Sequence, residues 1–449
     1  MISETRMDEL ERQTMRKVLR RYVPLLILCF VVSFLDRVNI GFAALTMNRE
    51  LGFSATVFGI GAGLFFIGYV IFEVPSNLIL ERVGARRWIA RIMLTWGVLS
   101  ACMAFVQGPT SFYVLRILLG VAEAGFFPGI MLYFTYWIPG TWRGRVVSIF
   151  MAAMPFANVF GSLLSGYLLG LDGVLGLRGW QLMFIAEGLP AILLAFVVLA
   201  VLRDSPDHAN WLSEPERQWL SLTIAIERSR VTTARYPGLR VLRNPVLVAL
   251  ALAYFGINLS IFGLSFFLPQ IVRAFDLSLV MVGVIAAIPS FIAGIGMMWW
   301  GGRSDQHDER RFHVLLPMGL AVIGLGGSTL AAMPVLKLAC LCLAAFGTFS
   351  AVAIFWSTLP ILLGPAVAAV GFGAINSFGN LAGFTAPYAI GVVRDATGSF
   401  NAGIQLIAIY GCFAFATLAW AMRGVHGGAG RRERPDTTGV VSVSSVKRP

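Results

Sequence analysis

The chain has 449 residues, of which 57% are hydrophobic and only 13% are charged, with a formal net charge of +12. Soluble domains carry about a quarter of charged residues, so this composition excludes a soluble protein. The five cysteines have no metal-ligand spacing and lie within apolar segments, which indicates packed core residues and not a metal centre.

Apolar residues gather in twelve runs, and a run of about 20 residues crosses a bilayer as a helix. The predicted spans are 24–46, 57–80, 88–106, 111–137, 145–170, 180–202, 246–272, 278–300, 312–334, 338–363, 367–393 and 403–422. The longest polar stretch separates the first six spans from the last six. We therefore predict an all-α membrane protein, with twelve transmembrane helices in two pseudo-symmetric six-helix bundles.

Five segments follow from this pattern. The tail 1–23 is expected to form an amphipathic helix, and the bundles occupy 24–202 and 245–422. The central loop is 203–244, and the tail 423–449, rich in Gly and then in Ser and Val, is expected to be disordered.

The basic residues are distributed unevenly along the chain. With the N-terminus in the cytoplasm, 28 of the 35 Lys and Arg residues fall in cytoplasmic segments. The positive-inside rule then predicts a multi-pass protein of a bacterial inner membrane, with both termini cytoplasmic. Because this rule also explains the basic excess, the charge gives no support to a nucleic-acid partner; the expected partners are the bilayer and a small anionic molecule, and the protein is expected to be a monomer.

Two short motifs recur between the halves. The loop after the second span has Glu81 followed by Arg86 and Arg87, and the loop after the eighth has Asp305 followed by Arg310 and Arg311, an offset of 224 residues. A Phe-x-Asn-x-x-Gly motif around Asn158 in the fifth span recurs around Asn380 in the eleventh, at an offset of 222. Matches at nearly one offset indicate parallel repeats, which place a ligand site at the midplane between them.

Twelve spans, a central loop and the acid-x4-Arg-Arg loop resemble the major facilitator superfamily, although Glu81 stands where Asp is commoner. Further stretches are similar to its anion:cation symporter branch: Phe34–Asn39, Arg116–Gly125, Trp180–Pro190 and Phe266–Gln270. The resemblance implies alternating-access uptake, with protons, of organic carboxylates such as sugar acids, tartrate or phthalate. It implies no enzymatic activity and no cofactor beyond the coupling proton.

Ionisable residues inside the spans cost roughly 2.5–3.5 kcal/mol each, so each one needs a reason. All six lie in the first half: Asp36, Arg37, Glu73, Arg116, Glu123 and Glu187. The second-half spans have no charge in their interiors. We therefore expect the first half to hold the charge chemistry and the second half to supply neutral contacts.

Asp36, Arg37, Arg116 and Glu123 lie near mid-depth in the first and fourth spans. A guanidinium presents a planar fork to a carboxylate and keeps its proton, so Arg37 is the candidate for binding an anion. Burial favours the neutral form of a carboxyl, so Asp36 and Glu123, with Arg116 beside them, are candidates for carrying the coupling proton. The resemblance implies the same roles for the two acids and for Arg37. Because the four charges cancel, two buried salt bridges between the spans are the alternative.

Other polar residues supply the remaining candidates for the site. Tyr69 is a candidate substrate contact, with a packed aromatic ring as the alternative. Glu73 is expected to be structural or part of gating, and Glu187 to be structural. In the second half, amides and hydroxyls suit a hydroxylated acid, and the candidates are Asn258, Trp356, Ser357, Asn376 and Asn380. Packing is the alternative for the asparagines.

The two repeated loops are expected to lie at cytoplasmic helix ends. The resemblance implies that they act as conformational latches, through Glu81, Arg82, Arg86, Arg87, Asp305, Arg310 and Arg311. A plain basic loop is the alternative.

The sequence leaves several functions open. Uptake of a sugar acid or tartrate-like hydroxy acid is the leading hypothesis, and uptake of an aromatic carboxylate would suit the phenylalanines of the second half. Antiport or efflux of a metabolite or drug is a rival, disfavoured because the fifth span lacks a Gly-Pro-rich stretch. A membrane sensor or embedded enzyme would need an effector domain or a catalytic motif, and the sequence has no metal spacing, phosphate loop or nucleophile–base motif.

Overall fold

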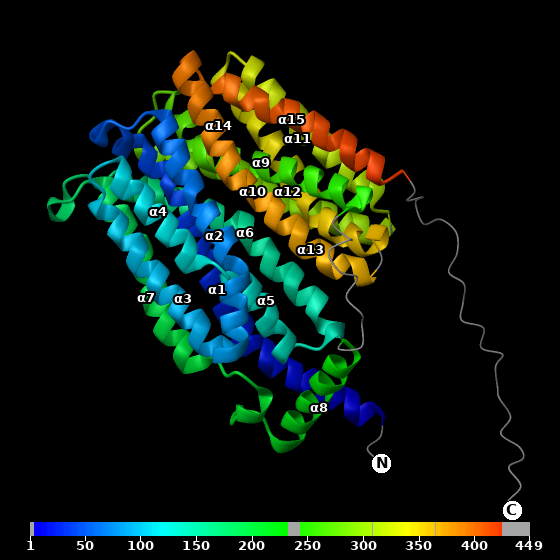
Figure 1. Ribbon diagram of the computed structural model, residues 1–449. Coiled ribbons are helices and arrows are strands. Elements are labelled where there is room, and N and C mark those ends of the chain that lie inside the picture. The colour runs from blue at the N-terminus through cyan, green and yellow to red at the C-terminus, as the bar shows by residue number, and fades with distance from the viewer. Residues whose placement is uncertain (1–3, 232–242, 308, 364, 424–449) are drawn as a thin grey trace, which may run out of the picture.

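The computed structural model describes residues 4–231, 243–307, 309–363 and 365–423, and within them it contains helices and no strand (Figure 1). The helices before the polar region are α1 (Glu4–Leu51), α2 (Ala55–Val83), α3 (Ala85–Cys102), α4 (Pro109–Glu123), α5 (Phe126–Trp137), α6 (Gly140–Leu169) and α7 (Gly179–Val201). The later ones are α8 (Glu214–Val231), α9 (Pro245–Arg273), α10 (Leu279–His307), α11 (Arg311–Leu330), α12 (Pro334–Leu363), α13 (Pro365–Asn380), α14 (Ala382–Thr397) and α15 (Phe400–Ala421). Short 3-10 helices occupy Met103–Phe105, Val174–Gly176 and Pro206–His208.

The predicted all-helical membrane fold is confirmed. In the described residues, 11 helical stretches are long and apolar enough to cross a membrane. The predicted span 367–393 is instead divided between α13 and α14, each 16 residues long, with Leu381 between them. The twelve predicted spans thus correspond to eleven long helical stretches and one divided one.

The fourth span is broken in its middle. α4 ends at Glu123, and the chain turns through Ala124 and Gly125, whose φ of +84° suits glycine, before α5 starts. A Cβ on Gly125 would lie 2.3 Å from the Ser76 hydroxyl of α2, so the close packing of α2 against this turn also requires glycine here. The break puts the Glu123 carboxyl at a helix end deep inside the bundle.

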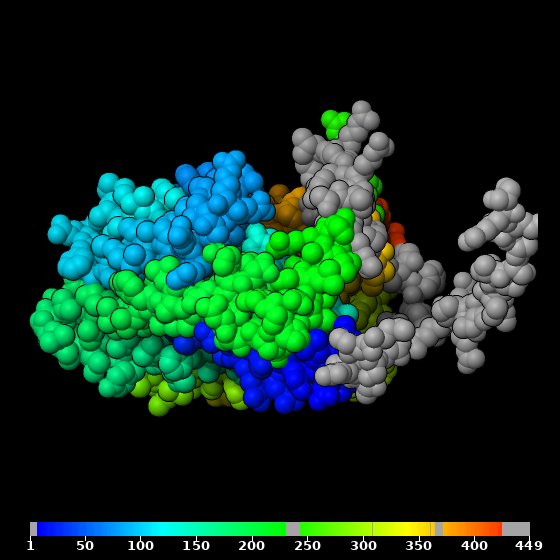
Figure 2. All heavy atoms as spheres, turned by 90° about the horizontal axis from the view of Figure 1, so that it is seen from below, coloured from blue at the N-terminus to red at the C-terminus, as the bar shows by residue number. Residues whose placement is uncertain are grey.

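The polar region between the halves contains a helix that the sequence did not predict. α8 packs against the first part of α1, where Lys17 Nζ lies 2.8 Å from Glu216 Oε1. Figure 2 looks at this end of the molecule, here called the α8 face, and shows α8 in green beside the start of α1 in blue. α1 itself is continuous from Glu4, so the predicted tail helix and first span are one helix. The other parts of the predicted loop and tails, 1–3, 232–242 and 424–449, lie outside the described residues.

The two halves meet at the end away from α8, here called the opposite face. α2 runs beside α14, and α6 beside α10 (Figure 1). The backbones approach closely, since a Cβ on Gly166 would lie 2.7 Å from Gly283 Cα and one on Gly59 would lie 2.2 Å from Pro387 O. Asp395 adds a polar contact, because its carboxylate accepts hydrogen bonds from the N–H groups of Ala55 (3.0 Å) and Thr56 (2.8 Å) at the start of α2.

Candidate functional site

The centre of the first half holds an ion pair between α1 and α4. Arg37 Nη2 lies 2.6 Å from Glu123 Oε1, and Arg37 Nε donates to the same oxygen at 2.9 Å. The Ser33 hydroxyl donates to it as well, at 2.8 Å. Glu123 is fully buried and its Oε2 has no hydrogen-bond partner in the described residues, whereas the Arg37 side chain remains 19% exposed. One predicted salt bridge between these spans is therefore present.

Aromatic rings surround the Arg37 guanidinium. Its Cζ lies 5.4 Å from the ring centre of Phe34, 5.6 Å from that of Phe65 and 5.3 Å from that of Tyr69. Aromatic faces attract a cation without using its N–H donors. The three rings thus hold the guanidinium beside Glu123.

Asp36 points into the core of the first half. It is buried, and its Oδ1 accepts hydrogen bonds from the Ser100 hydroxyl of α3 and from Asn39 Nδ2 at 3.1 Å. Its Oδ2 has no hydrogen-bond partner in the described residues. Asp36 and Arg37 are about 100° apart around α1, which explains why their surroundings differ.

Arg116 is bonded to the backbone of α2. Its Nε donates to Gly61 O at 3.2 Å and its Nη2 to Ala62 O at 3.1 Å. The second salt bridge of the alternative interpretation is thus not formed, although Asp36 and Glu123 still act on Arg116 through their charges. Arg116 contributes a buried positive charge and joins α4 to α2.

Glu73 links this cluster to the second half. It lies one turn after Tyr69 on α2, is 7% exposed, and its Oε1 accepts a hydrogen bond of 3.3 Å from Asn376 Nδ2 of α13. Contacts thus join Glu123 to Arg37 and Arg37 to the Tyr69 ring, and a separate hydrogen bond joins Glu73, one helix turn after Tyr69, to Asn376. Five candidates from four helices, α1, α2, α4 and α13, belong to one site.

The other second-half candidates differ in their surroundings. Asn258 is buried beside Tyr254, near the place where α13 crosses α9. The Trp356 ring lies 4.7 Å from that of Tyr254 and belongs to the same group. Ser357 is exposed and donates to Ile354 O of its own helix, and Asn380 is half-buried at the end of α13. The structure thus gathers Asn258 and Trp356 around Tyr254, whereas Asn376 is bonded to Glu73 and Ser357 is bonded within its own helix.

The first predicted latch is bonded within its own half. The N–H of Arg86 donates to Asp204 Oδ1 at 2.9 Å, and its Nε donates to Leu199 O at 2.7 Å. The other three members, Glu81, Arg82 and Arg87, are exposed. They lie at the α8 face, around the end of α2 and the start of α3.

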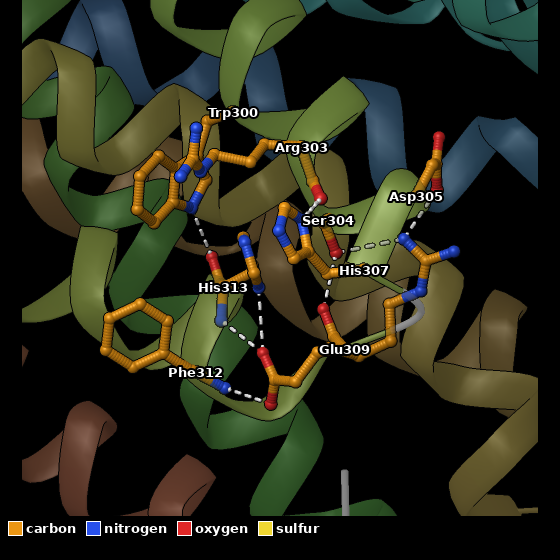
Figure 3. A network of polar contacts seen from close by, with 9 residues as sticks. Trp300, Arg303, Ser304, Asp305, His307, Glu309, Phe312 and His313 are labelled. Atoms are coloured by element: carbon orange, nitrogen blue, oxygen red, sulfur yellow. Dashed lines mark hydrogen bonds and ion pairs between the residues drawn. The ribbon is translucent and has the colours of Figure 1, made fainter. Parts of the chain in front are cut away.

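The second predicted latch forms a local network between α10 and α11 (Figure 3). Arg310 Nη1 lies 2.6 Å from Asp305 Oδ1 and donates to the Ser304 hydroxyl at 3.0 Å. Glu309 Oε1 accepts from the N–H of Phe312 at 2.7 Å, at the start of α11. Arg311 is exposed. These contacts shape the loop within the second half.

Sequence reasoning missed several polar residues that complete the site. Ser33, Asn39 and Ser100 bind the two candidate proton carriers, and Ser165 donates to Glu187 Oε1 at 2.7 Å. It also missed Asp395, which joins the halves. An isolated Ser or Asn in an apolar run is a weak signal. Asp395, by contrast, is a charged residue just after the predicted span 367–393, and its position could have marked it as a candidate.

A small cavity lies between the halves near the opposite face. It has a volume of about 30 Å³ and is lined by Phe42 of α1, Asn158 of α6 and Pro269 of α9, among others. This volume accommodates a water molecule and not an organic acid. In the described residues, no group of three or more His, Cys, Asp or Glu side chains is arranged to hold a metal ion.

The chain is similar to proteins that are named as transporters. A protein named "Putative tartrate transporter" from Agrobacterium vitis is 50% identical over 401 residues, which cover 89% of this chain and 93% of that protein. A "Quinolone resistance transporter" from Acinetobacter baumannii is 40% identical over 403 residues, covering 89% and 93%.

Among solved structures, a D-xylose-proton symporter superposes with a TM-score of 0.74 at 16% identity, covering 92% of this chain and 99% of that one. Finally, a family model described as Major Facilitator Superfamily matches residues 26–387.

Proposed function

Since this chain belongs to the Major Facilitator Superfamily, as its sequence motifs indicated, we propose that it imports a small organic carboxylate together with protons. It is a multi-pass membrane transporter and not an enzyme. Its bacterial relatives indicate the inner membrane. The coupling ion, the substrate class and the direction are the proposed parts.

The ion pair between Arg37 and Glu123 carries the proposal. A carboxylate of the protein occupies the guanidinium that a substrate carboxylate would need. Protonating Glu123 removes the competing charge and leaves Arg37 with an uncompensated positive charge in a low-dielectric site, which strongly favours an incoming anion. Proton binding and anion binding then support each other, as symport requires.

Asp36 is the second proposed proton carrier. It has one oxygen without a hydrogen-bond partner in the described residues, and its bonds come from neutral groups only. Arg116 contributes a buried positive charge near both acids, and its hydrogen bonds to Gly61 O and Ala62 O hold it there. In this scheme the two acids bind protons from outside and lose them to the cytoplasm.

The positive-inside rule assigns the α8 face to the cytoplasm. The halves meet at the opposite face, so the arrangement corresponds to a carrier closed toward the outside. Import then requires the contacts at the opposite face to separate while the α8 face closes. The loops of Glu81 and Asp305 lie at the α8 face and are proposed to bridge the halves in that second arrangement.

A hydroxylated acid suits the neutral side of the site. Asn258 and Asn376 offer amides, and Tyr69 offers a hydroxyl, beside the single guanidinium of Arg37. The relative from Agrobacterium vitis is named for tartrate, which has two carboxylates and two hydroxyls. Tartrate isomers and sugar acids are therefore proposed first, and aromatic acids second.

Uptake into proteoliposomes tests the coupling. With labelled tartrate, sugar acids and aromatic acids in sodium-free buffer, an inward proton gradient should accelerate uptake of at least one acid severalfold. Asp36→Asn and Glu123→Gln should abolish the acceleration. Uptake that ignores an imposed pH gradient, or that requires sodium, would contradict proton symport.

Drug efflux is the second candidate, because one relative is a quinolone resistance transporter. Cells expressing the chain would then accumulate less quinolone, and inverted vesicles would take the drug up when energised. A severalfold drop in quinolone accumulation without uptake of any carboxylate would favour efflux.

A further inference from the structure

The site contains a second carboxyl that holds a candidate substrate contact. Glu73 Oε1 accepts a hydrogen bond from Asn376 Nδ2, just as Glu123 Oε1 accepts from Arg37. Both acids belong to the first half. The two groups best placed to receive an anion, a guanidinium in α1 and an amide in α13, are therefore each bonded to a carboxyl of the protein.

Glu73 is poorly supported as an ionised group. It is 7% exposed, and its Oε2 has no hydrogen-bond partner in the described residues. The titratable groups around it are Arg37 of α1, Tyr69 of its own helix and Tyr254 of α9, and the only cation among these is Arg37, which is paired with Glu123. A carboxylate with one amide donor and a shared cation gains a proton readily when a second anion approaches.

We propose that Glu73 is a second exchanging acid of the site, which binds Asn376 when ionised and releases it to the far end of a two-ended anion when protonated. This inference rests on the proposed function and narrows its substrate class. One end of the anion replaces Glu123 at Arg37, and the other end replaces Glu73 at Asn376. A dicarboxylate or hydroxy diacid fits, and each internal acid takes up one proton as it is displaced.

The spacing agrees with a short diacid. Arg37 lies over the ring of Tyr69, and Asn376 reaches Glu73 four residues later on α2, which is about 6 Å of helix rise. The outermost oxygens of an extended four-carbon diacid have a comparable separation. The Tyr69 hydroxyl between the two ends would suit a hydroxyl on the carbon chain.

The hydrogen bond between Glu73 and Asn376 also joins the two halves. Proton binding at Glu73 should therefore change the position of one half relative to the other. This gives a test that needs no substrate. Spin labels at Ser148 of α6 and Ile361 of α12, both exposed, would report the distance between the halves as pH varies, in a protein whose five native cysteines are replaced. The slope of the conformational equilibrium against pH counts the protons exchanged.

Glu73→Gln should lower this slope by about one proton. Asn376→Ala should do the same, and the double variant should show no further decrease, because both changes remove one bond. Asn376→Ala also keeps the test decisive if Glu73→Gln fails to fold. Glu187→Gln is the matched control, since Glu187 is equally buried but is bonded to Ser165 within the first half. An unchanged slope in Glu73→Gln and Asn376→Ala would overturn the inference.

Labelled L-tartrate supplies the second measurement. The proton number per tartrate, determined from the pH gradient that stops net uptake at a clamped potential, should fall by about one in Glu73→Gln. Proton-coupled uptake with the same proton number in wild type and Glu73→Gln would overturn the role of Glu73 and leave the proposed function standing. Uptake indifferent to the pH gradient in the wild type would overturn the proposed function, and the spin-label measurement would still decide on Glu73.

Discussion

Arg37 and Asp36 are adjacent in α1 and have opposite surroundings. Arg37 faces aromatic rings and Glu123 at the edge of the first half, while Asp36 faces Ser100 and Asn39 in its core. One residue is therefore within reach of a substrate and the other is shielded from it. In the proposed mechanism, a proton on Asp36 would act on the anion through charge, whereas a proton on Glu123 would act by ending its competition with the anion for Arg37.

Glu123→Gln should weaken the coupling of anion binding to pH. A glutamine cannot ionise, so Arg37 no longer has a charged competitor, and the stabilisation by tartrate should differ less between pH 6 and pH 8 than in the wild type, with Asp36 and Glu73 accounting for the remaining difference. The wild type should be stabilised more at the lower pH. Thermal unfolding of purified protein with and without tartrate measures this.

Arg37→Lys provides the comparison, because a point charge replaces the fork and binding should weaken about tenfold. Retention of the wild-type pH dependence in Glu123→Gln would contradict the competition between Glu123 and the anion.

The sequence indicated which residues carry the buried charges, because the cost of burial made them conspicuous. It did not determine the pairing, since Arg37 and Arg116 both lay within reach of Glu123. The Arg116 donors are taken by the carbonyls of Gly61 and Ala62, which depends on how closely α4 packs against α2. That packing requires glycine at position 120, where a Cβ would lie 2.0 Å from Phe65 O.

At the scale of helices, the breaks in the fourth and eleventh spans were not predicted. Both runs are predominantly apolar, and periodicity alone does not reveal a turn inside them. Gly125 was the available signal, but glycine is frequent in membrane helices and is ambiguous there. The break matters because it places Glu123 at the end of α4, beside α1.

Glu309 should make the loop between α10 and α11 sensitive to acid. Burial opposes its ionisation, but the N–H groups of Phe312 and His313 outweigh this effect and hold the pKa of the carboxyl below its ordinary value. A lowered pKa in the folded state adds stability above the unfolded pKa, near 4.3, and this stability is lost as pH falls through the folded pKa.

Glu309→Gln should therefore lower the thermal midpoint at pH 7, by an amount corresponding to about 1 kcal/mol for a lost helix cap. The variant should also lose less stability than the wild type between pH 6 and pH 4. Thermal unfolding in detergent over this range checks both. An equal loss in the two proteins would show that Glu309 does not contribute through its charge.

At the scale of the whole molecule, Asp395 fastens one half to the other. Its carboxylate accepts from the first N–H groups of α2, where the helix dipole favours a negative charge. Asp395→Ala should favour separation at the opposite face, by roughly fivefold for about 1 kcal/mol. Labelling of Ser265→Cys by an impermeant maleimide measures this opening.

Asp172→Asn is the control for this experiment, because Asp172 accepts from Gly179 within the first half and does not join the halves. Unchanged labelling in Asp395→Ala would mean that the glycine contacts alone hold this face closed.

The overall architecture was predictable because long apolar runs leave few alternatives to membrane helices. α8 was not, since its sequence is polar and it is held by contacts distant in the chain. Lys17 pairs with Glu216, and the Tyr22 ring of α1 lies 5.7 Å from that of Trp211, just before α8. For the candidate site, the sequence suggested individual residues such as Arg37, Glu123 and Asn376. It did not suggest the bond between Glu73 and Asn376, because this bond depends on how the halves are arranged.

Gly166 approaches Gly283 closely, and Gly59 approaches the Pro387 carbonyl. A single methyl group added at one of these glycines would therefore push the two halves apart at the opposite face. Each added carbon would destabilise the closed arrangement of this face without contacting Arg37 or Glu123. In a series of such substitutions, from smaller to larger side chains, the conformational equilibrium should shift stepwise toward the arrangement in which the opposite face is open. Antibodies or inhibitors that recognise only one shape could then be selected against a defined series instead of a mixture.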